Sequence, residues 1–224
     1  MAQKSRTKKY LAKLLTSNRK TAADLEEYQY RGLDVARKEL RLVLVVPARD
    51  EQEPIQAVLV HASLESSPPP AYETVSYVWG SPKQRAPLTL DETCIAAPAS
   101  SVAALRRLRK PESPRTLWID AICIDQTNNV ERAQQVAIMS EIYSNSDGNL
   151  IYLGEGDQKS IMALRDMHLV LKDMYRETSG LSSVGVKDTV LDRDRISGGY
   201  ASHGFQSDVD FDRLVTFFAL PWFR

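Results

Sequence analysis

Alternating hydrophobic and polar positions predict strands in the first half of the chain. In residues 39–47 (ELRLVLVVP) leucines alternate with other residues at the two-residue period of a strand, and Pro47 marks its end. Residues 55–64 have the same β-rich character. Because only a short polar stretch separates these segments, we expect an N-terminal antiparallel β pair. Residues 88–95 predict a small β-hairpin insertion.

Apolar runs separated by helical patterns predict a parallel sheet in the second half. The run LWIDAICI at residues 117–124 is typical of a strand that is covered on both faces. Strand-helix-strand units that follow one another favour parallel strands with right-handed crossovers, and so an α/β fold. The expected strands are residues 73–78, 117–124 and 150–153, and the helices between them are residues 100–110 and 128–143.

Apolar stripes at helical spacing indicate which helix faces should be buried. In the helix at residues 128–143, the stripe expected to face the core is Val130, Ala133, Val136, Ala137, Met139, Ile142 and Tyr143. A later helix carries the stripe Ile161, Leu164, His168, Leu171 and Tyr175. Residues 179–207 are rich in Gly, Ser and Asp and predict a mobile loop, after which a final helix starts at about residue 208.

The composition narrows the classes of function. The 224 residues are 43% hydrophobic, and 29 Lys+Arg balance 29 Asp+Glu. This composition excludes collagen-like, coiled-coil and wholly disordered classes, and zero net charge gives no overall field that would attract nucleic acid. The Cys count of 2 does not make a disulfide framework, and no apolar run is long enough for a membrane span. We therefore expect a cytoplasmic protein without a nucleic-acid partner.

The basic N-terminal segment is set apart from the predicted core. Residues 1–20 carry several lysines and arginines and no acid. A solvated tail is the simpler interpretation, and a membrane-surface or targeting role is the alternative. We expect residues 1–38 to form a basic, partly disordered or helical extension and residues 39–224 to form the domain.

The expected sheet also predicts where a ligand would bind. Ligands of open parallel sheets bind outside the carboxyl ends of the strands, where loops and helix N-termini meet. That rule selects the loops at residues 77–81, 125–128 and 154–157. The last loop contains GEG, a poor match to a dinucleotide fingerprint, because a third glycine is missing and its acids would repel a pyrophosphate.

Asp120 is the most informative single residue. A carboxylate within the apolar run LWIDAICI needs a charged or hydrogen-bonding partner to stay ionised. It could hold a ribose hydroxyl or orient a catalytic group, but a structural acid bonded to backbone or to a nearby polar side chain is the favoured interpretation. The candidate partners are Ser76, Tyr77 and Arg132.

Other residues near the strand ends have two interpretations each. Asp125 and Gln126 could recognise a ligand or serve the following helix. Asn128 and Glu131 have capping-box spacing, which needs no ligand. Trp79 could stack on a ring, although core packing is the commoner role. The histidines have no metal-ligand spacing with either cysteine, so no metal site is expected.

Several sequence blocks together resemble a known family. The blocks are YETVSYVWG at residues 72–80, LWIDAICIDQ at 117–126, ERAQQVAIMSEIY at 131–143 and LIYLG at 150–154. In order and spacing they resemble the HET domain of fungal heterokaryon-incompatibility proteins. The resemblance implies an intracellular effector of programmed cell death in fungal non-self recognition and innate immunity, which acts through self-association or protein partners.

The HET resemblance also implies distant kinship with Toll/interleukin-receptor-type (TIR) domains. Some TIR domains cleave NAD at the nicotinamide-ribose bond, so an NAD+ hydrolase is the alternative function, with NAD as substrate and no certain cofactor. In the family pattern the glutamate for such chemistry would lie beyond Arg224, so the catalytic residue is unassigned.

The resemblance and the residue patterns together define the expected fold and site. The expected fold is a TIR-like, flavodoxin-like parallel α/β sheet flanked by helices, with the β pair and the hairpin added. The candidate ligand-binding residues are Ser76, Tyr77, Trp79, Gly80, Asp120, Asp125, Gln126, Glu131 and Arg132.

Overall fold

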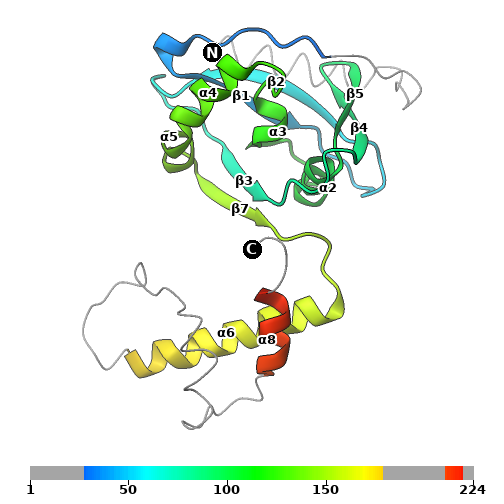
Figure 1. The fold of residues 1–224 in the computed structure, drawn as a ribbon, viewed down its shortest axis with the longest axis vertical. Helices are drawn as coiled ribbons and strands as arrows, with labels where there is room; N and C mark the ends of the chain where they lie inside the picture. Colours follow the sequence, from blue (N-terminus) through cyan, green and yellow to red (C-terminus); the bar gives the residue numbers. More distant parts are fainter. Residues whose placement is uncertain (1–27, 179–209, 219–224) are drawn as a thin grey trace. The chain divides into compact units, whose positions relative to one another are not determined.

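The computed structural model describes residues 28–178 and 210–218 of the chain (Figure 1). The chain divides into two compact units, residues 1–154 and residues 155–224. The first unit contains the sheet, and the second contains two helices among its described residues. No helix in the described part is long and apolar enough to cross a membrane.

A mixed sheet forms the centre of the first unit (Figure 1). It is 7-stranded, and its strand order is β5-β4-β2-β1-β6-β3-β7. The strands are β1 (Glu39–Val45), β2 (Gln56–Ser63), β3 (Glu73–Tyr77), β4 (Arg85–Leu90), β5 (Thr93–Pro98), β6 (Arg115–Trp118) and β7 (Gly148–Tyr152).

Three neighbouring strands, β6, β3 and β7, run parallel. Glu73 on β3 aligns with Leu117 on β6 and with Gly148 on β7. The predicted α/β fold is therefore confirmed, and the predicted antiparallel pair β1–β2 and hairpin β4–β5 are also present. These four strands extend the same sheet, because β1 pairs with β6 and β2 pairs with β4.

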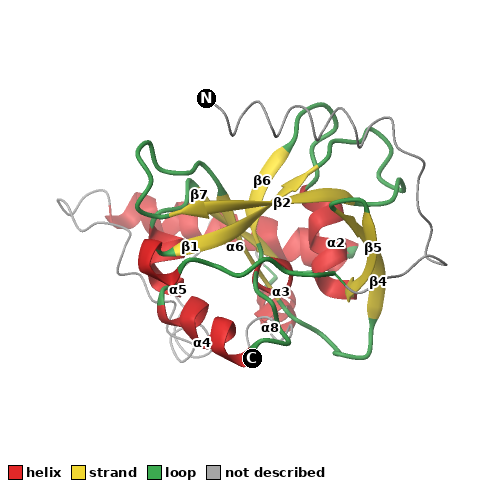
Figure 2. Cartoon of the chain, turned by 90° about the horizontal axis from the view of Figure 1, so that it is seen from above, coloured by secondary structure: helices red, strands yellow, loops and turns green. Residues whose placement is uncertain are grey.

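Helices pack against this sheet and complete the main core (Figure 2). The helices in the described part of the first unit are η2 (Val35–Arg37), α2 (Ala99–Leu108), α3 (Asp120–Cys123), α4 (Asn129–Ala137) and α5 (Met139–Ser144). The fully buried core side chains include Leu40, Ile55, Leu88, Leu105, Leu117, Trp118 and Ile122. Burying one large apolar side chain stabilises a fold by roughly 1.5–3 kcal/mol, so this core fixes the positions of the strand ends.

The strand predicted at residues 117–124 is shorter than expected. Strand β6 ends at Trp118, and the helical turn α3 follows it. The residues of α3 after Asp120 are buried, just as they would be on a strand covered on both faces, so the apolar run could not distinguish the two structures. As a result, Asp120 lies just beyond the carboxyl end of β6 rather than within a strand.

The helix predicted at residues 128–143 is two helices, and the expected buried face of the first is wrong. Helix α4 buries Glu131 and Gln135. It exposes Val130 and Val136, which are 68% and 55% accessible to solvent. The reason is that Arg41, a buried residue of β1, forms an ion pair with Glu131 on the polar face of α4.

The second unit contains α6 (Gln158–Thr178) and α8 (Phe211–Phe218). Asp166 of α6 and Arg213 of α8 form an ion pair with a nitrogen-oxygen distance of 3.2 Å. The stripe predicted on α6 is not buried. Its exposed members are Ile161, Leu164, His168 and Leu171. The loop predicted at residues 179–207 and the basic segment 1–20 lie outside the described residues.

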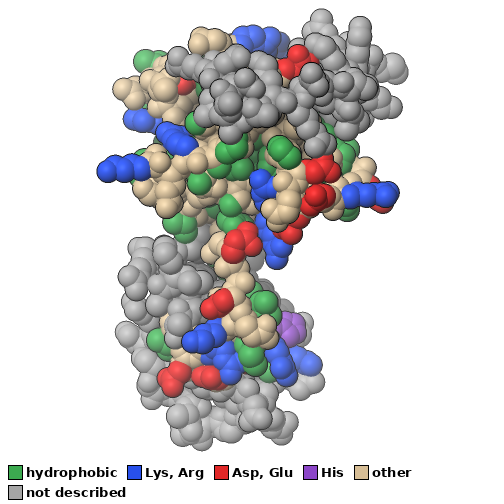
Figure 3. Space-filling model, turned by 90° about the vertical axis from the view of Figure 1, so that its right-hand side faces the viewer, with side chains coloured by type: hydrophobic (Ala, Val, Ile, Leu, Met, Phe, Trp, Pro, Cys, Tyr) green, Lys and Arg blue, Asp and Glu red, His purple; other side chains and the backbone are tan. Residues whose placement is uncertain are grey.

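Charged side chains of both signs lie near one another on the face that Figure 3 shows. Exposed ion pairs occur in the first unit, such as Arg107 and Glu51, whose charged groups are 3.2 Å apart. Exposed pairs of this kind contribute at most about 1 kcal/mol, so they affect solubility more than stability.

Candidate functional site

The carboxyl ends of β3 and β6 meet, as the strand-end rule predicts. The indole Nε1 of Trp79, after β3, donates a hydrogen bond of 2.9 Å to the Asp120 carboxylate, after β6. The side-chain amide of Gln126 donates to the backbone carbonyl of Asp120 at 2.9 Å. Asp120 therefore ties three segments together, and the favoured structural interpretation of this residue fits these contacts.

Two titratable groups, Asp120 and Tyr77, are buried at these strand ends. Burial raises the pKa of the Asp120 carboxyl, and the hydrogen bonds from Trp79 and from the Ala121 amide only partly oppose that effect. The Tyr77 hydroxyl is also buried, and burial together with the charge of Asp120 raises the pKa of Tyr77. Two groups with raised pKa values thus lie side by side at the strand ends.

The turn after β3 depends on a glycine. Gly80 has a φ of +68°, a conformation that other residues rarely adopt. Beside it, the Ser100 hydroxyl of α2 donates a hydrogen bond to the Trp79 carbonyl at 2.5 Å. Together these features fix the direction of the Trp79 side chain, which is 46% exposed.

The start of α4 is built by internal contacts rather than for a ligand. The Asn128 side chain accepts hydrogen bonds from the Val130 and Glu131 amides, so the capping interpretation of Asn128 is confirmed. The Glu131 carboxylate binds the guanidinium of Arg41 at 2.6 Å and 2.9 Å. It also accepts the Asp125 amide at 2.8 Å. The buried Glu131 side chain therefore holds the loop that carries Asp125.

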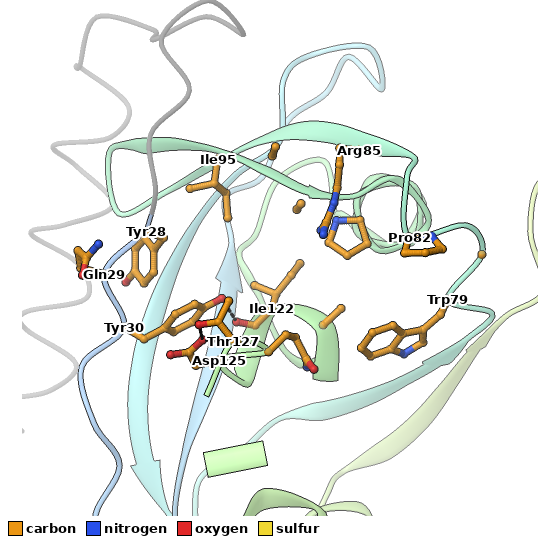
Figure 4. A pocket seen from close by; sticks show the side chains of 16 residues that line it. Tyr28, Gln29, Tyr30, Trp79, Pro82, Arg85, Ile95, Ile122, Asp125 and Thr127 are labelled. Atoms are coloured by element: carbon orange, nitrogen blue, oxygen red, sulfur yellow. Dashed lines mark hydrogen bonds between the residues drawn. The ribbon is translucent and has the colours of Figure 1, made fainter. Parts of the chain in front are cut away.

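A cavity of about 800 Å³ opens beside the Trp79 side chain (Figure 4). Four of the predicted residues line it: Trp79, Gly80, Asp125 and Gln126. The lining is completed by Tyr28, Gln29, Tyr30, Pro82, Arg85, Ile95, Ala96, Ala97, Pro98, Ala121, Ile122 and Thr127. Its size is within the range of small-molecule sites, which are mostly apolar with a few polar groups.

The remaining predicted residues do not line the cavity. Tyr77 and Asp120 are not among its lining residues, although Asp120 binds Trp79, and Glu131 is bound to Arg41. Ser76 contacts Tyr143 and Asn149 instead, at 3.3 Å and 3.1 Å. Arg132 is exposed. Of the nine predicted residues, four therefore line the cavity and five do not.

The loop at residues 154–157 is not part of the cavity lining. In the second unit, the Asp157 side chain accepts the Ser160 amide at 2.8 Å and so caps the start of α6. No group of three or more His, Cys, Asp or Glu residues suited to a metal ion occurs among the described residues.

Two walls of the cavity were missed by sequence reasoning. One is the segment with Tyr28 and Tyr30, which precedes η2, and the other is the β4–β5 hairpin with Arg85 and Ile95. Both come from outside the parallel strands, and the hairpin reaches the site only because β4 pairs with β2. No local pattern in the sequence signals such a long-range contact.

Comparison with known proteins connects this site to a family. Residues 72–203 match the family model described as heterokaryon incompatibility protein (HET). The chain is 29% identical over 147 residues to heterokaryon incompatibility protein 6, OR allele, of Neurospora crassa. This match covers 60% of the chain but only 21% of the relative, so the chain spans about a fifth of the relative's length. No solved structure matches the chain.

Proposed function

The chain belongs to the HET family, as its sequence blocks predicted, and from this premise we propose that it takes part in fungal heterokaryon incompatibility. We propose further that it is a cytoplasmic effector of programmed cell death in non-self recognition, acting through self-association or a protein partner. The observation that carries the proposal is the HET match over residues 72–203, because that span contains most of the cavity lining.

Inducible expression of the chain in a filamentous fungus tests the effector role. We expect growth arrest and uptake of a vital dye in cells that express the wild-type chain. Trp79→Ala, which removes an exposed ring from the cavity, should lower the fraction of dead cells. Val136→Ala changes an exposed residue outside the cavity lining and should leave that fraction unchanged. Folded wild-type chain that accumulates without loss of viability would overturn the proposal.

The chemistry of the cavity favours a second candidate function, cleavage of NAD. Trp79 lines the cavity and is half-exposed, and its N–H bond to Asp120 holds the indole ring in place, which suits stacking on a planar ring. The Arg85 side chain points toward the cavity from β4, opposite Asp125 (Figure 4). A guanidinium suits a phosphate and a carboxylate suits ribose hydroxyls. The TIR-like kinship that suggests this reaction stays a prediction.

Hydrolysis of NAD would proceed by attack of water on the ribose C1′ carbon. The bond from C1′ to nicotinamide breaks, its electron pair goes to the nicotinamide ring, and the proton of the water passes to solvent. The products are ADP-ribose and nicotinamide. Within the described residues we assign binding roles to Trp79, Arg85 and Asp125 and no catalytic role.

Release of nicotinamide from NAD, followed by chromatography, tests the enzymatic proposal. Loss of ring stacking in Trp79→Ala should weaken NAD binding about tenfold, because stacking of one base on an aromatic side chain is worth about 1–3 kcal/mol. Arg85→Gln should weaken binding of NAD but not of nicotinamide riboside, which has no phosphate. A folded chain that neither binds NAD nor releases nicotinamide would refute this second function and leave the first intact.

A further inference from the structure

Residues 28–33, here called the strap, form a wall of the cavity without pairing as a strand. The strap contributes Tyr28, Gln29 and Tyr30 to the lining (Figure 4). No backbone-to-backbone hydrogen bond joins residues 28–33 to the described part of the chain. A cavity wall formed by a strand is normally held by backbone hydrogen bonds to the neighbouring strand. The strap lacks such bonds, so each contact that holds it involves at least one side chain.

Among the described residues, three hydrogen bonds and a 3.6 Å ion pair between Arg31 and Glu39 hold the strap in place. The Tyr28 hydroxyl donates to the Asp91 carboxylate in the β4–β5 turn. The Tyr30 hydroxyl donates to the Ile122 carbonyl of α3 at 3.0 Å. Arg41 donates to the backbone carbonyl of Arg31 at 2.5 Å. The strap therefore bridges the hairpin, α3 and β1, which are three separate parts of the fold.

Ring contacts reinforce these bonds. The rings of Tyr28 and Tyr30 meet edge to face, with their centroids 4.9 Å apart. The guanidinium of Arg41 lies 4.8 Å from the centroid of the Tyr30 ring. Both tyrosines are partly buried, whereas Gln29 and Arg31 are exposed. The strap thus attaches through both tyrosine side chains and through Arg31, while the Gln29 side chain is exposed.

The groups that receive the strap are held independently of it. Asp91 accepts the Leu59 amide at 3.2 Å and sits at a positive φ of 49° in the hairpin turn. Arg41 is fixed by its ion pair with Glu131. After Arg31 the chain continues through Gly32, which has no atom within 4 Å of an added Cβ. The receiving surface can therefore persist when the strap leaves.

We propose that the strap is a displaceable wall, so that the cavity exists in a closed state with both tyrosines in place and an open state with the strap released. An occupant that contacts Tyr28 and Tyr30 binds the closed state more tightly and shifts the population toward it. This coupling rests on the proposed role of the cavity as a ligand site. The existence of the two states does not.

Trypsin cleavage after Arg31 in the full chain measures release of the strap. Arg41 binds the carbonyl of the very peptide bond that trypsin cuts, so cleavage requires the open state. Tyr28→Phe removes a hydrogen bond to a carboxylate and should raise the cleavage rate about tenfold, since cleavage follows the open population when opening is fast. Tyr30→Phe removes a bond to a neutral carbonyl and should have a smaller effect.

Two controls separate release of the strap from general unfolding. Tyr72→Phe also removes one tyrosine hydrogen bond, to the Ile142 carbonyl at 2.6 Å, but Tyr72 lies outside the cavity lining. It should leave cleavage after Arg31 unchanged. Cleavage after Arg115, in strand β6, reports global unfolding and should stay slow in Tyr28→Phe. Equal cleavage after Arg31 in wild type, Tyr28→Phe and Tyr30→Phe overturns the proposal.

The dye 8-anilinonaphthalene-1-sulfonate tests the coupling to the cavity, because it combines apolar rings with an anion that Arg85 can bind. Linkage requires that the factor by which the dye slows cleavage after Arg31 equals the factor by which release of the strap weakens dye binding. Dye binding that is lost in Trp79→Ala, together with slower cleavage, supports the coupling. Absence of such binding, or binding that leaves cleavage unchanged, refutes it. Neither result depends on NAD.

Discussion

Helices α2 and α4 both follow strands of the same sheet, yet they bury opposite kinds of residue. Helix α2 buries Val102, Ala104 and Leu105, with Ser101 beside them. Helix α4 buries Glu131 and Gln135 and turns its valines to solvent. The two helices have comparable amphipathic patterns. The difference in which face they bury therefore comes from the side chains of the sheet that each helix packs against.

The residue that decides the orientation of α4 is Arg41. Its side chain is 1% exposed, and a buried guanidinium is costly unless it is paired. Glu131 supplies both oxygens, and Gln135 adds a hydrogen bond from its amide to the Glu39 carbonyl at 3.0 Å. Electrostatic pairing of one buried group therefore outweighs burial of two valines. The same pair positions Asp125 at the cavity.

The largest expected effect is that of breaking this buried pair. Glu131→Ala leaves the Arg41 charge buried without its partner and should lower the free energy of unfolding by about 3–5 kcal/mol. Urea unfolding followed by circular dichroism measures it. Arg132→Ala, at the exposed neighbouring position, is the matched control and should change stability by less than about 0.5 kcal/mol. Equal effects of the two substitutions would show that the pair does not orient α4.

Substitutions in helix α2 should instead destabilise the fold through the loss of apolar packing. Leu105 is fully buried, so Leu105→Ala should lower the free energy of unfolding by about 3 kcal/mol. The loss comes from the apolar groups that are no longer buried and from the cavity that they leave. Because no charge is involved, the loss should be the same in low and high salt, measured by urea unfolding at both ionic strengths. If the loss of unfolding free energy in Leu105→Ala depended on salt, it would contradict the view that α2 is held by apolar packing and α4 by a buried ion pair.

A more exposed ion pair provides the third comparison. Arg115 binds Glu73 at 2.6 Å and 2.8 Å, with their side chains 16% and 27% exposed. The hydrogen bonds from Arg115 lower the pKa of Glu73 from 4.5. Glu73→Gln should cost only about 0.5–1 kcal/mol at pH 7, much less than Glu131→Ala, because solvent screens this pair.

The pH dependence of that effect follows from the direction of the pKa shift. A lowered pKa in the folded state stabilises the fold above the unfolded value of 4.5 and loses this contribution as the pH falls through the folded pKa. The difference in unfolding free energy between wild type and Glu73→Gln should therefore shrink between pH 7 and pH 3. A difference that is constant over this range would rule out the ion pair as its source.

Sequence patterns were sufficient for the parallel strands and insufficient for α4. Strands β3, β6 and β7 could be located because each contains β-branched or aromatic residues next to turn-forming or polar residues, although the predicted bounds of β6 were wrong. The orientation of α4 was not, because Arg41 and Glu131 are 90 residues apart in the chain and both look like solvent-facing residues in their own segments. Local periodicity carries no information about such a partner.

The candidate site divides in the same way. Trp79, Gly80, Asp125 and Gln126 were predictable because they follow parallel strands that end at one edge of the sheet. Tyr28 and Arg85 were not, because the strap and the hairpin reach the cavity through long-range pairing. Half of the site was therefore a consequence of strand order, and the other half a consequence of contacts between distant segments.

The smallest expected effect is at Val136, and it tests the comparison most directly. If the apolar face of α4 is in solvent, Val136→Gln should change the free energy of unfolding by less than about 0.5 kcal/mol, since glutamine is no worse than valine in a helix. Val102 of α2 is 3% exposed, so Val102→Gln buries an amide and should cost several times more. The two valines differ only in their surroundings, and thermal or urea unfolding measures both. A large loss in Val136→Gln would mean that α4 presents its valines to the core after all, and that Arg41 does not determine its orientation.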